Sequence, residues 1–167
     1  AFFLNCTTYD YELIDIPKNY LFNLIDSNID RKLRESSYNE RFNELKKAQL
    51  ILKTKYLNSI SIKEFNKKKF DNAIIKKRAR HVISENERVL KAKNAMKDGD
   101  MDYFGQLMNE SHNSYSKNFN ASNKIIDNII KRSINCGALG SRLTGGGFGG
   151  FIISLIRKKN FNQWKSK

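Results

Sequence analysis

A run of glycine residues limits the possible folds of this chain more than any other part of its sequence. The segment GSRLTGGGFGG, residues 140–150, holds six glycines in eleven positions, and Phe148 carries its only side chain after Thr144. Glycine adds no packing and loses much conformational freedom on folding, so such a run indicates positive backbone φ angles or a close approach of the backbone to another group. It exceeds what a short hairpin turn needs. We therefore expect a loop between two strands that lies against a ligand or another domain.

Three known phosphate-binding motifs do not fit this glycine run. A Walker A loop requires a lysine and then a serine or threonine after its last glycine, whereas Phe151 follows Gly150. Gly145, Gly147 and Gly150 match the GxGxxG spacing, but a dinucleotide-binding fold needs a helix next and an acidic residue further on. The following FIISLI is strand-like, and no Asp or Glu occurs in the rest of the sequence. A protein-kinase loop would need further motifs downstream, which this sequence lacks.

Hydrophobic patterning predicts strands at both ends of the chain and helices between them. Residues 1–25 indicate a first hairpin, a break at Pro17 and a further strand, and FIISLI at 151–156 indicates a buried strand. The expected helices cover residues 37–53, a short segment from Ser61, residues 71–97, a segment after Asp100, and residues 122–133. This order indicates an α+β fold with helices packed on an antiparallel sheet.

Two capping boxes and one glycine mark the expected helix boundaries. Ser37 with Glu40, and Ser61 with Glu64, have the spacing at which side chains and backbone bond reciprocally at a helix start. Gly99 is expected to end the long helix. The inward stripe of that helix is expected to consist of Ile75, Ala79, Val82, Asn86 and Val89.

Charge and cysteine content narrow the classes of function. The net charge is +14, with cationic runs at 67–69 and 76–80, but cations are spread along the chain and mixed with acids. We expect solvated helix faces at these runs and no nucleic-acid partner. No apolar run reaches the roughly 18 residues of a membrane span, so no membrane partner is expected. Cys6 and Cys136 are expected to be buried, reduced thiols of a cytoplasmic protein.

Several segments together resemble galactokinases, a branch of the GHMP small-molecule kinase family. GSRLTGGGFGG at 140–150 resembles the third signature motif of these enzymes. RARHVISENERV at 78–89 resembles a helix characteristic of the galactokinase branch, and LMNESH at 107–112 resembles the segment that follows it. DSN at 26–28 and SSYN at 36–39 fit a further family region, with aspartate in place of the usual first asparagine. The resemblance covers nearly the whole chain and matches the C-terminal half of the family.

The resemblance implies a GHMP-kinase C-terminal domain of ferredoxin-like type. Residues 1–19 would be strands at the end of the N-terminal half, and residues 20–167 would form the C-terminal domain, incomplete at its C-terminus. The implied reaction is transfer of the γ-phosphoryl group of ATP to galactose, giving galactose 1-phosphate, with Mg²⁺. The family motifs that bind ATP and supply the catalytic base belong to the N-terminal half. We therefore expect that half as a partner, no catalytic or metal-binding residue here, and no activity of this chain alone.

The resemblance also carries two groups of site residues over to this chain. Tyr38 matches a family tyrosine that hydrogen-bonds galactose, although Ser37 and Phe42 stand where Glu and Arg are usual. Phe148 is expected to pack beneath the glycine loop, and Phe151 replaces a common family cysteine. The residues expected to line the cleft are Thr144, Gly145, Gly146, Gly147, Gly149 and Gly150.

The long helix carries a second group of polar residues. Arg78, His81, Glu85 and Arg88 are spaced to share one helix face. A histidine between a carboxylate and arginines can act as a base or a pH switch. We instead expect a buried polar network that fixes the helix against its neighbours, and we expect the same of His112.

Other functions stay open on the sequence alone. An N-acetylgalactosamine kinase shares these motifs. A non-catalytic galactose sensor that regulates through a bound partner, and an inactive remnant of a kinase, are also compatible with them.

Overall fold

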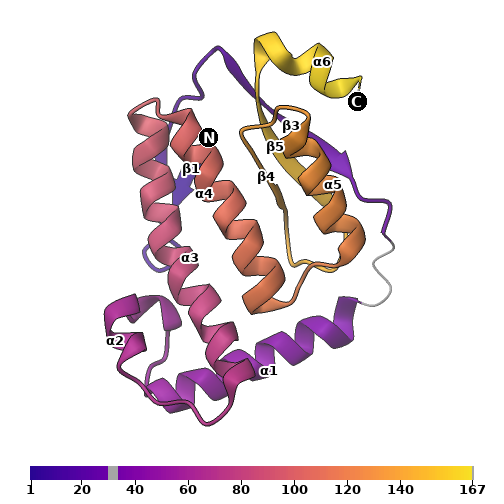
Figure 1. Ribbon diagram of the computed structural model, residues 1–167. Coiled ribbons are helices and arrows are strands. Elements are labelled where there is room, and N and C mark those ends of the chain that lie inside the picture. The colour runs from indigo at the N-terminus through magenta and orange to yellow at the C-terminus, as the bar shows by residue number, and fades with distance from the viewer. Residues whose placement is uncertain (30–33, 167) are drawn as a thin grey trace.

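The strands of the structure form two separate antiparallel sheets. The computed structural model describes residues 1–29 and 34–166 (Figure 1). The first sheet is a hairpin of two short strands, and the second has the strand order β3-β5-β4. The strands are β1 (Phe2–Leu4), β2 (Tyr11–Leu13), β3 (Tyr20–Asp26), β4 (Gly140–Leu143) and β5 (Phe151–Arg157). The expected domain boundary after residue 19 falls between the two sheets and stays a prediction, and Lys167, the end of the expected second domain, lies outside the described residues.

Helices fill the chain between the third and fourth strands and follow the fifth. They are α1 (Arg34–Leu52), α2 (Ile62–Asn66), α3 (Ala73–Lys97), α4 (Met101–Ser114), α5 (Lys124–Asn135) and α6 (Phe161–Lys165), with a π-helical turn at Tyr115–Phe119. Single 3₁₀ turns occur at Leu57–Ser59 and Lys158–Asn160. The expected α+β class, with helices packed on an antiparallel sheet, is confirmed. None of the described helices is long and apolar enough to cross a membrane.

Most helix boundaries follow the local signals in the sequence. The Ser61 hydroxyl accepts a hydrogen bond from the Glu64 amide at 3.2 Å, and the Glu64 carboxylate accepts one from the Ser61 amide at 2.9 Å, so this capping box is confirmed. Gly99 follows α3 with a φ of +73°. The capping box expected at Ser37 is wrong, because α1 already begins at Arg34 and Ser37 lies inside its first turn.

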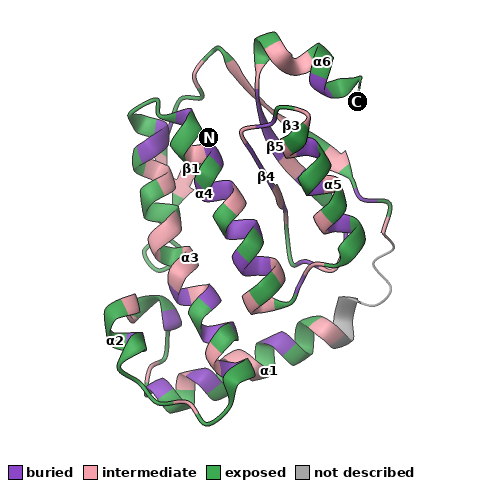
Figure 2. Ribbon diagram, in the orientation of Figure 1, coloured by how far each residue is buried: buried purple, intermediate pink, exposed green. Residues whose placement is uncertain are grey.

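The two faces of β5 contact different helices, as alternation along a strand requires. Ile152 packs with Ile126 and Ile130 of α5, whereas Leu155 packs with Met108 of α4. Buried residues therefore occur along β4, β5 and α4 (Figure 2). Trp164 is buried and donates a hydrogen bond from Nε1 to the Ser133 carbonyl at 3.1 Å, which attaches α6 to α5.

Helix α4 and strand β4 approach each other closely through two glycines. A Cβ on Gly105 would lie 2.7 Å from the Leu139 carbonyl carbon, and a Cβ on Gly140 would lie 2.7 Å from the Gly105 Cα. Asn109 bridges the same contact, donating to the Leu139 carbonyl at 3.1 Å and accepting from the Ser141 amide at 2.9 Å. This contact fixes the strand from which the glycine loop begins.

The inward stripe expected for α3 is only partly correct. Ile75 and Ala79 are buried and Val82 is half-buried, but Asn86 and Val89 are exposed. Towards the middle of α3 the buried positions include polar Arg78 and His81 as well as apolar Ile83, so apolar spacing alone did not identify the inner face there. The buried residues of α3 are Ile75, Arg78, Ala79, His81, Ile83, Ala95 and Met96.

Two expectations about surface chemistry also change. Lys67–Lys69 are exposed, as expected of a solvated face, but Arg78 within the second cationic run is buried and paired with Glu44. Both cysteines are free thiols, yet Cys6 is exposed and Cys136 is half-buried, so their expected burial is wrong. Cys6 lies in the turn between β1 and β2, where few side chains can cover it.

Candidate functional site

The glycine loop connects β4 to β5 and is fixed at both of its ends. The Thr144 amide and hydroxyl both donate to the Phe151 carbonyl, at 2.9 and 2.7 Å. The Gly150 carbonyl accepts a hydrogen bond from the Ser27 amide at 3.0 Å, so the DSN segment after β3 lies beside the loop. Within the loop Gly147, Gly149 and Gly150 are buried, whereas Gly145 and Gly146 are exposed.

Backbone conformation and close contacts within the chain explain most of these glycines. Gly145, Gly147, Gly149 and Gly150 have φ angles of +69°, +90°, +154° and +93°, a region that side chains disfavour. A Cβ on Gly147 would lie 2.7 Å from the Tyr115 hydroxyl, and one on Gly149 would lie 2.9 Å from the Ile29 carbonyl oxygen. Folding alone therefore requires glycine at these positions.

Gly146 is different, because neither its φ angle nor its surroundings require glycine. A Cβ placed there would meet only two ring carbons of Tyr38, at 3.8 and 3.9 Å, which is ordinary contact. The exposed glycine pair thus leaves open backbone beside the Tyr38 ring. The structure brings together Tyr38 and the loop, two features that lie about a hundred residues apart in the sequence.

Tyr38 lies near the start of α1 and is 57% exposed, with its ring against the loop. A phenol in this position can donate and accept hydrogen bonds toward solvent. Phe148 packs partly buried against the cluster that contains Tyr115, Ala121 and Ile152, in agreement with its expected packing role.

Tyr115 also belongs to the candidate site, although it was not identified from the sequence. It begins the π-helical turn after α4, is buried, and donates from its hydroxyl to the Gly145 carbonyl at 3.1 Å. No pattern in the sequence signals a π-helical turn here, because the helical spacing of α4 continues without a break into it.

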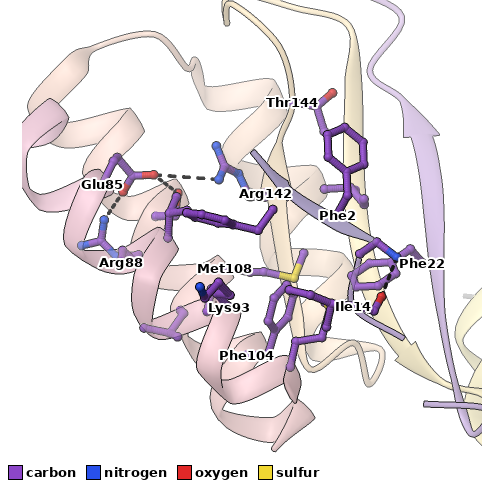
Figure 3. Close-up of a pocket in the computed structure, with 18 of the residues that line it drawn as sticks. Phe2, Ile14, Phe22, Glu85, Arg88, Lys93, Phe104, Met108, Arg142 and Thr144 are labelled. Atoms are coloured by element: carbon purple, nitrogen blue, oxygen red, sulfur yellow. Dashed lines mark hydrogen bonds and ion pairs between the residues drawn. The ribbon is translucent and has the colours of Figure 1, made fainter. Parts of the chain in front are cut away.

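A pocket of about 500 Å³ reaches the other side of the loop at Thr144 and Gly145 (Figure 3). Its walls come from the hairpin, α3, α4 and strands β3, β4 and β5. Apolar side chains form most of the lining, and charged side chains from α3 and β4 stand at one end. The apolar and aromatic lining includes Phe2, Ile14, Phe22, Phe104 and Met108.

The charged end of this pocket is a hydrogen-bonded cluster around Glu85. The Glu85 carboxylate accepts hydrogen bonds from Ser111 Oγ at 2.5 Å and from Arg88 Nη1. Arg142 Nη1 lies 3.8 Å from Glu85 Oε2, a distance that holds the two charges together without a direct hydrogen bond (Figure 3). This cluster attaches β4 to α3 and α4, as expected of a structural network.

The two histidines belong to such structural networks as well. His81 is buried, and its Nδ1 lies 2.9 Å from Ser114 Oγ. Burial, and then the positive charges of Arg142, Arg88 and Arg78, lower the pKa of His81 to about 3. His81 is therefore neutral near pH 7, and it lies within the protein rather than at the exposed loop.

His112 is buried with its Nε2 3.0 Å from Asp127 Oδ1. Burial lowers the pKa of His112, and the hydrogen bond and charge of Asp127 oppose that shift. The same carboxylate also accepts hydrogen bonds from Ser116 and Ser122, so this cluster fixes α5 to the segment before it. The expected structural role of both histidines fits these contacts.

Comparison with known proteins finds a family model and several similar proteins. The family model described as GHMP kinases C terminal matches residues 90–163. A galactokinase of Thermotoga neapolitana is 38% identical over 172 residues, which are 100% of this chain and 47% of that relative. A galactokinase of Lactobacillus helveticus is 37% identical over 174 residues, which are 99% of this chain and 45% of that relative. Residues 90–163 therefore carry a GHMP kinase C-terminal domain, and the chain as a whole is similar to galactokinases.

A solved structure supports the same assignment. The crystal structure of Lactococcus lactis galactokinase complexed with galactose matches this chain with a TM-score of 0.92 and 32% identity. The match covers 98% of this chain and 44% of the crystallised one. The chain thus spans about half the length of the curated relatives it matches, and the resemblance to the C-terminal portion of galactokinases is confirmed.

Proposed function

We propose that this chain forms one wall of a galactose site in a kinase that transfers phosphate from ATP to galactose. The observation that carries the proposal is the convergence of the exposed Tyr38 phenol with the open backbone of Gly145–Gly146. These two features come from distant parts of a chain similar to a galactokinase crystallised with galactose. Since the chain spans about half the length of its relatives, the activity belongs to a longer polypeptide in this proposal.

In this proposal the wall positions the sugar for the reaction. The Tyr38 hydroxyl hydrogen-bonds a sugar hydroxyl, and Gly145–Gly146 let the backbone approach because no side chain intervenes. Phosphoryl transfer depends mainly on the placement of its reactants and on the stabilisation of spread negative charge. A wall that holds the sugar in one orientation therefore contributes to the rate without any covalent step.

The proposal gives ATP and Mg²⁺ no site on the described residues. No group of three or more His, Cys, Asp or Glu side chains in the described ranges is arranged to hold a metal ion. The loop carries no lysine, and Arg142, the nearest arginine in sequence, is already directed toward Glu85. We therefore assign nucleotide and metal to the rest of the polypeptide, and we expect no turnover from residues 1–167 alone.

The test compares Tyr38→Phe with Tyr56→Phe in the polypeptide that contains this chain. Tyr56 is a similarly exposed tyrosine beyond the end of α1, and it serves as the matched control. Removing the Tyr38 hydroxyl should raise the KM for galactose about tenfold, the effect of losing one ordinary hydrogen bond to the substrate. The KM for ATP and the kinetics of Tyr56→Phe should stay unchanged. Equal galactose kinetics in the two variants would overturn the assignment of Tyr38.

A further inference from the structure

The π-helical turn Tyr115–Phe119 is connected to both parts of the proposed site, which are the glycine loop and the helix α1 that carries Tyr38. It continues α4 directly and ends at Asn120, whose φ of +56° and ψ of +45° are left-handed. Single π-helical turns are rare in helices and occur often at functional sites, because they redirect side chains. Here the turn places the buried Tyr115 ring under the glycine loop.

The glycine loop is attached to this turn and to the residues just after it. The Tyr115 hydroxyl donates to the Gly145 carbonyl at 3.1 Å, and it fills the space that a Cβ on Gly147 would occupy. The Phe148 amide donates to the Ala121 carbonyl at 2.8 Å, and the Ala121 amide donates to the Tyr115 carbonyl at 3.2 Å. Two hydrogen bonds, one at the Gly145 carbonyl and one at the Phe148 amide, therefore attach the exposed Gly145–Gly146 part of the loop to residues 115–121.

Aromatic contacts hold the Tyr115 ring itself in place. Its centroid lies 5.7 Å from that of Phe119, in a stacked arrangement, and 5.4 Å from that of His81. The ring thus keeps its position even if its hydroxyl is removed, because the stacking does not involve the oxygen.

The same turn is also connected to α1, the helix that carries Tyr38. Arg78 of α3 donates from Nη1 to the Asn118 carbonyl at 2.5 Å and from Nε to Glu44 Oε2 at 2.9 Å. Glu44 belongs to α1. One buried guanidinium therefore joins the π-helical turn to the helix on the opposite side of the site.

We propose that Tyr115 is a positioning residue for the sugar site. It contacts no substrate, and it acts by holding the Gly145 carbonyl so that the Gly145–Gly146 backbone keeps its place beside Tyr38. The expected effect on catalysis rests on the proposed function. The attachment of the loop by Tyr115 does not, because all of its contacts lie within this chain.

The first test measures amide hydrogen exchange by NMR in the polypeptide that contains this chain, for Tyr115→Phe and the control Tyr103→Phe. Tyr103 is a partly exposed tyrosine of α4. Tyr115→Phe keeps the ring and removes the bond to Gly145, so exchange of the Phe148 amide should accelerate about fivefold to tenfold. Exchange of amides in the middle of β5 and the midpoint of urea unfolding should change little in either variant. An unchanged Phe148 exchange rate in Tyr115→Phe would overturn the inference.

The second test measures galactose phosphorylation by the polypeptide that contains this chain. In Tyr115→Phe a displaced loop should raise the KM for galactose at least about threefold. This increase corresponds to part of the free energy of one hydrogen bond. A merely structural role would lower the amount of active enzyme and leave KM unchanged, which would contradict the inference. If the unmodified polypeptide phosphorylates no galactose, the proposed function fails, and the exchange rates alone decide whether Tyr115 positions the loop.

Discussion

At the scale of single residues, the five glycines of the loop are of two kinds. The fold accounts for four of them, and it does not account for Gly146. Gly147 combines a φ of +90° with Tyr115 and Ala121 atoms within 2.8 Å of any added Cβ. Gly146 has neither constraint, since only the Tyr38 ring lies near it. An open backbone at Gly146 therefore has no explanation in packing and fits the approach of a ligand.

This division predicts opposite outcomes for two alanine substitutions. Gly147→Ala should lower the free energy of unfolding by at least about 2 kcal/mol, because a strained φ adds to a contact that cannot relax easily. Gly146→Ala should change it by less than about 0.5 kcal/mol. Urea denaturation of both variants measures the difference, and equal stability of the two would contradict the contacts described for Gly147.

At the scale of elements, the contact between helices α1 and α3 depends on the carboxylate of Glu44. Glu44 of α1 lies 2.9 Å from both Arg41 Nη1 and Arg78 Nε, and all three side chains are largely buried. Glu40, in contrast, pairs with Arg41 from an exposed position. Two buried cations therefore share Glu44 as a counter-ion, and Arg78 Nε also donates a hydrogen bond to it.

Glu44→Gln should destabilise the chain by about 3 kcal/mol, because it removes the buried negative charge that lies between two buried guanidinium groups and leaves Arg41 only its exposed partner Glu40. Glu40→Gln removes an exposed pair with the same cation and should cost less than about 1 kcal/mol. Thermal and urea unfolding of both variants provide the comparison. A Glu44→Gln variant as stable as Glu40→Gln would show that the buried pairs do not hold α1 on α3.

Elements with strong local signals could be predicted from the sequence, and those set by tertiary contacts could not. The Ser61 capping box, Gly99 and the strand at 151–156 all lie where local chemistry places them. Ser37 has the same spacing as Ser61, yet α1 starts before it. The middle of α3 buries polar residues such as His81, so an apolar stripe could not identify its inner face.

The same contrast holds for the candidate site. Its two sequence features, Tyr38 and the glycine loop, were identified by resemblance, and the structure brings them into contact. Tyr115 was missed because its role depends on a π-helical turn and on a carbonyl thirty residues away. Neither of these has a local pattern in the sequence.

At the scale of the whole molecule, the β1–β2 hairpin exposes an apolar face. Phe2 lies opposite Leu13, and Leu4 lies opposite Tyr11, so these four side chains share one side of the hairpin. All four are exposed, Leu13 to 75%. In the proposed kinase the rest of the polypeptide covers this face.

The isolated chain should therefore associate through the hairpin as its concentration rises, because an uncovered apolar face favours self-contact. Light scattering after size-exclusion chromatography measures the mass over a range of concentrations. Leu13→Lys should shift the chain toward the monomer, whereas Leu50→Lys, at an exposed leucine of α1, should not. A chain that stays monomeric at every concentration would contradict an uncovered interface at the hairpin.

A structure of the polypeptide that contains this chain, determined with galactose bound, would show directly whether Tyr38 and the glycine loop contact the sugar. The proposal places the Tyr38 hydroxyl at about 2.7 Å from a sugar hydroxyl, the ordinary length of such a bond. It also places the Gly145–Gly146 backbone along the same cleft. A sugar bound elsewhere, with Tyr38 in contact only with solvent, would contradict the claim that this chain forms a wall of the galactose site.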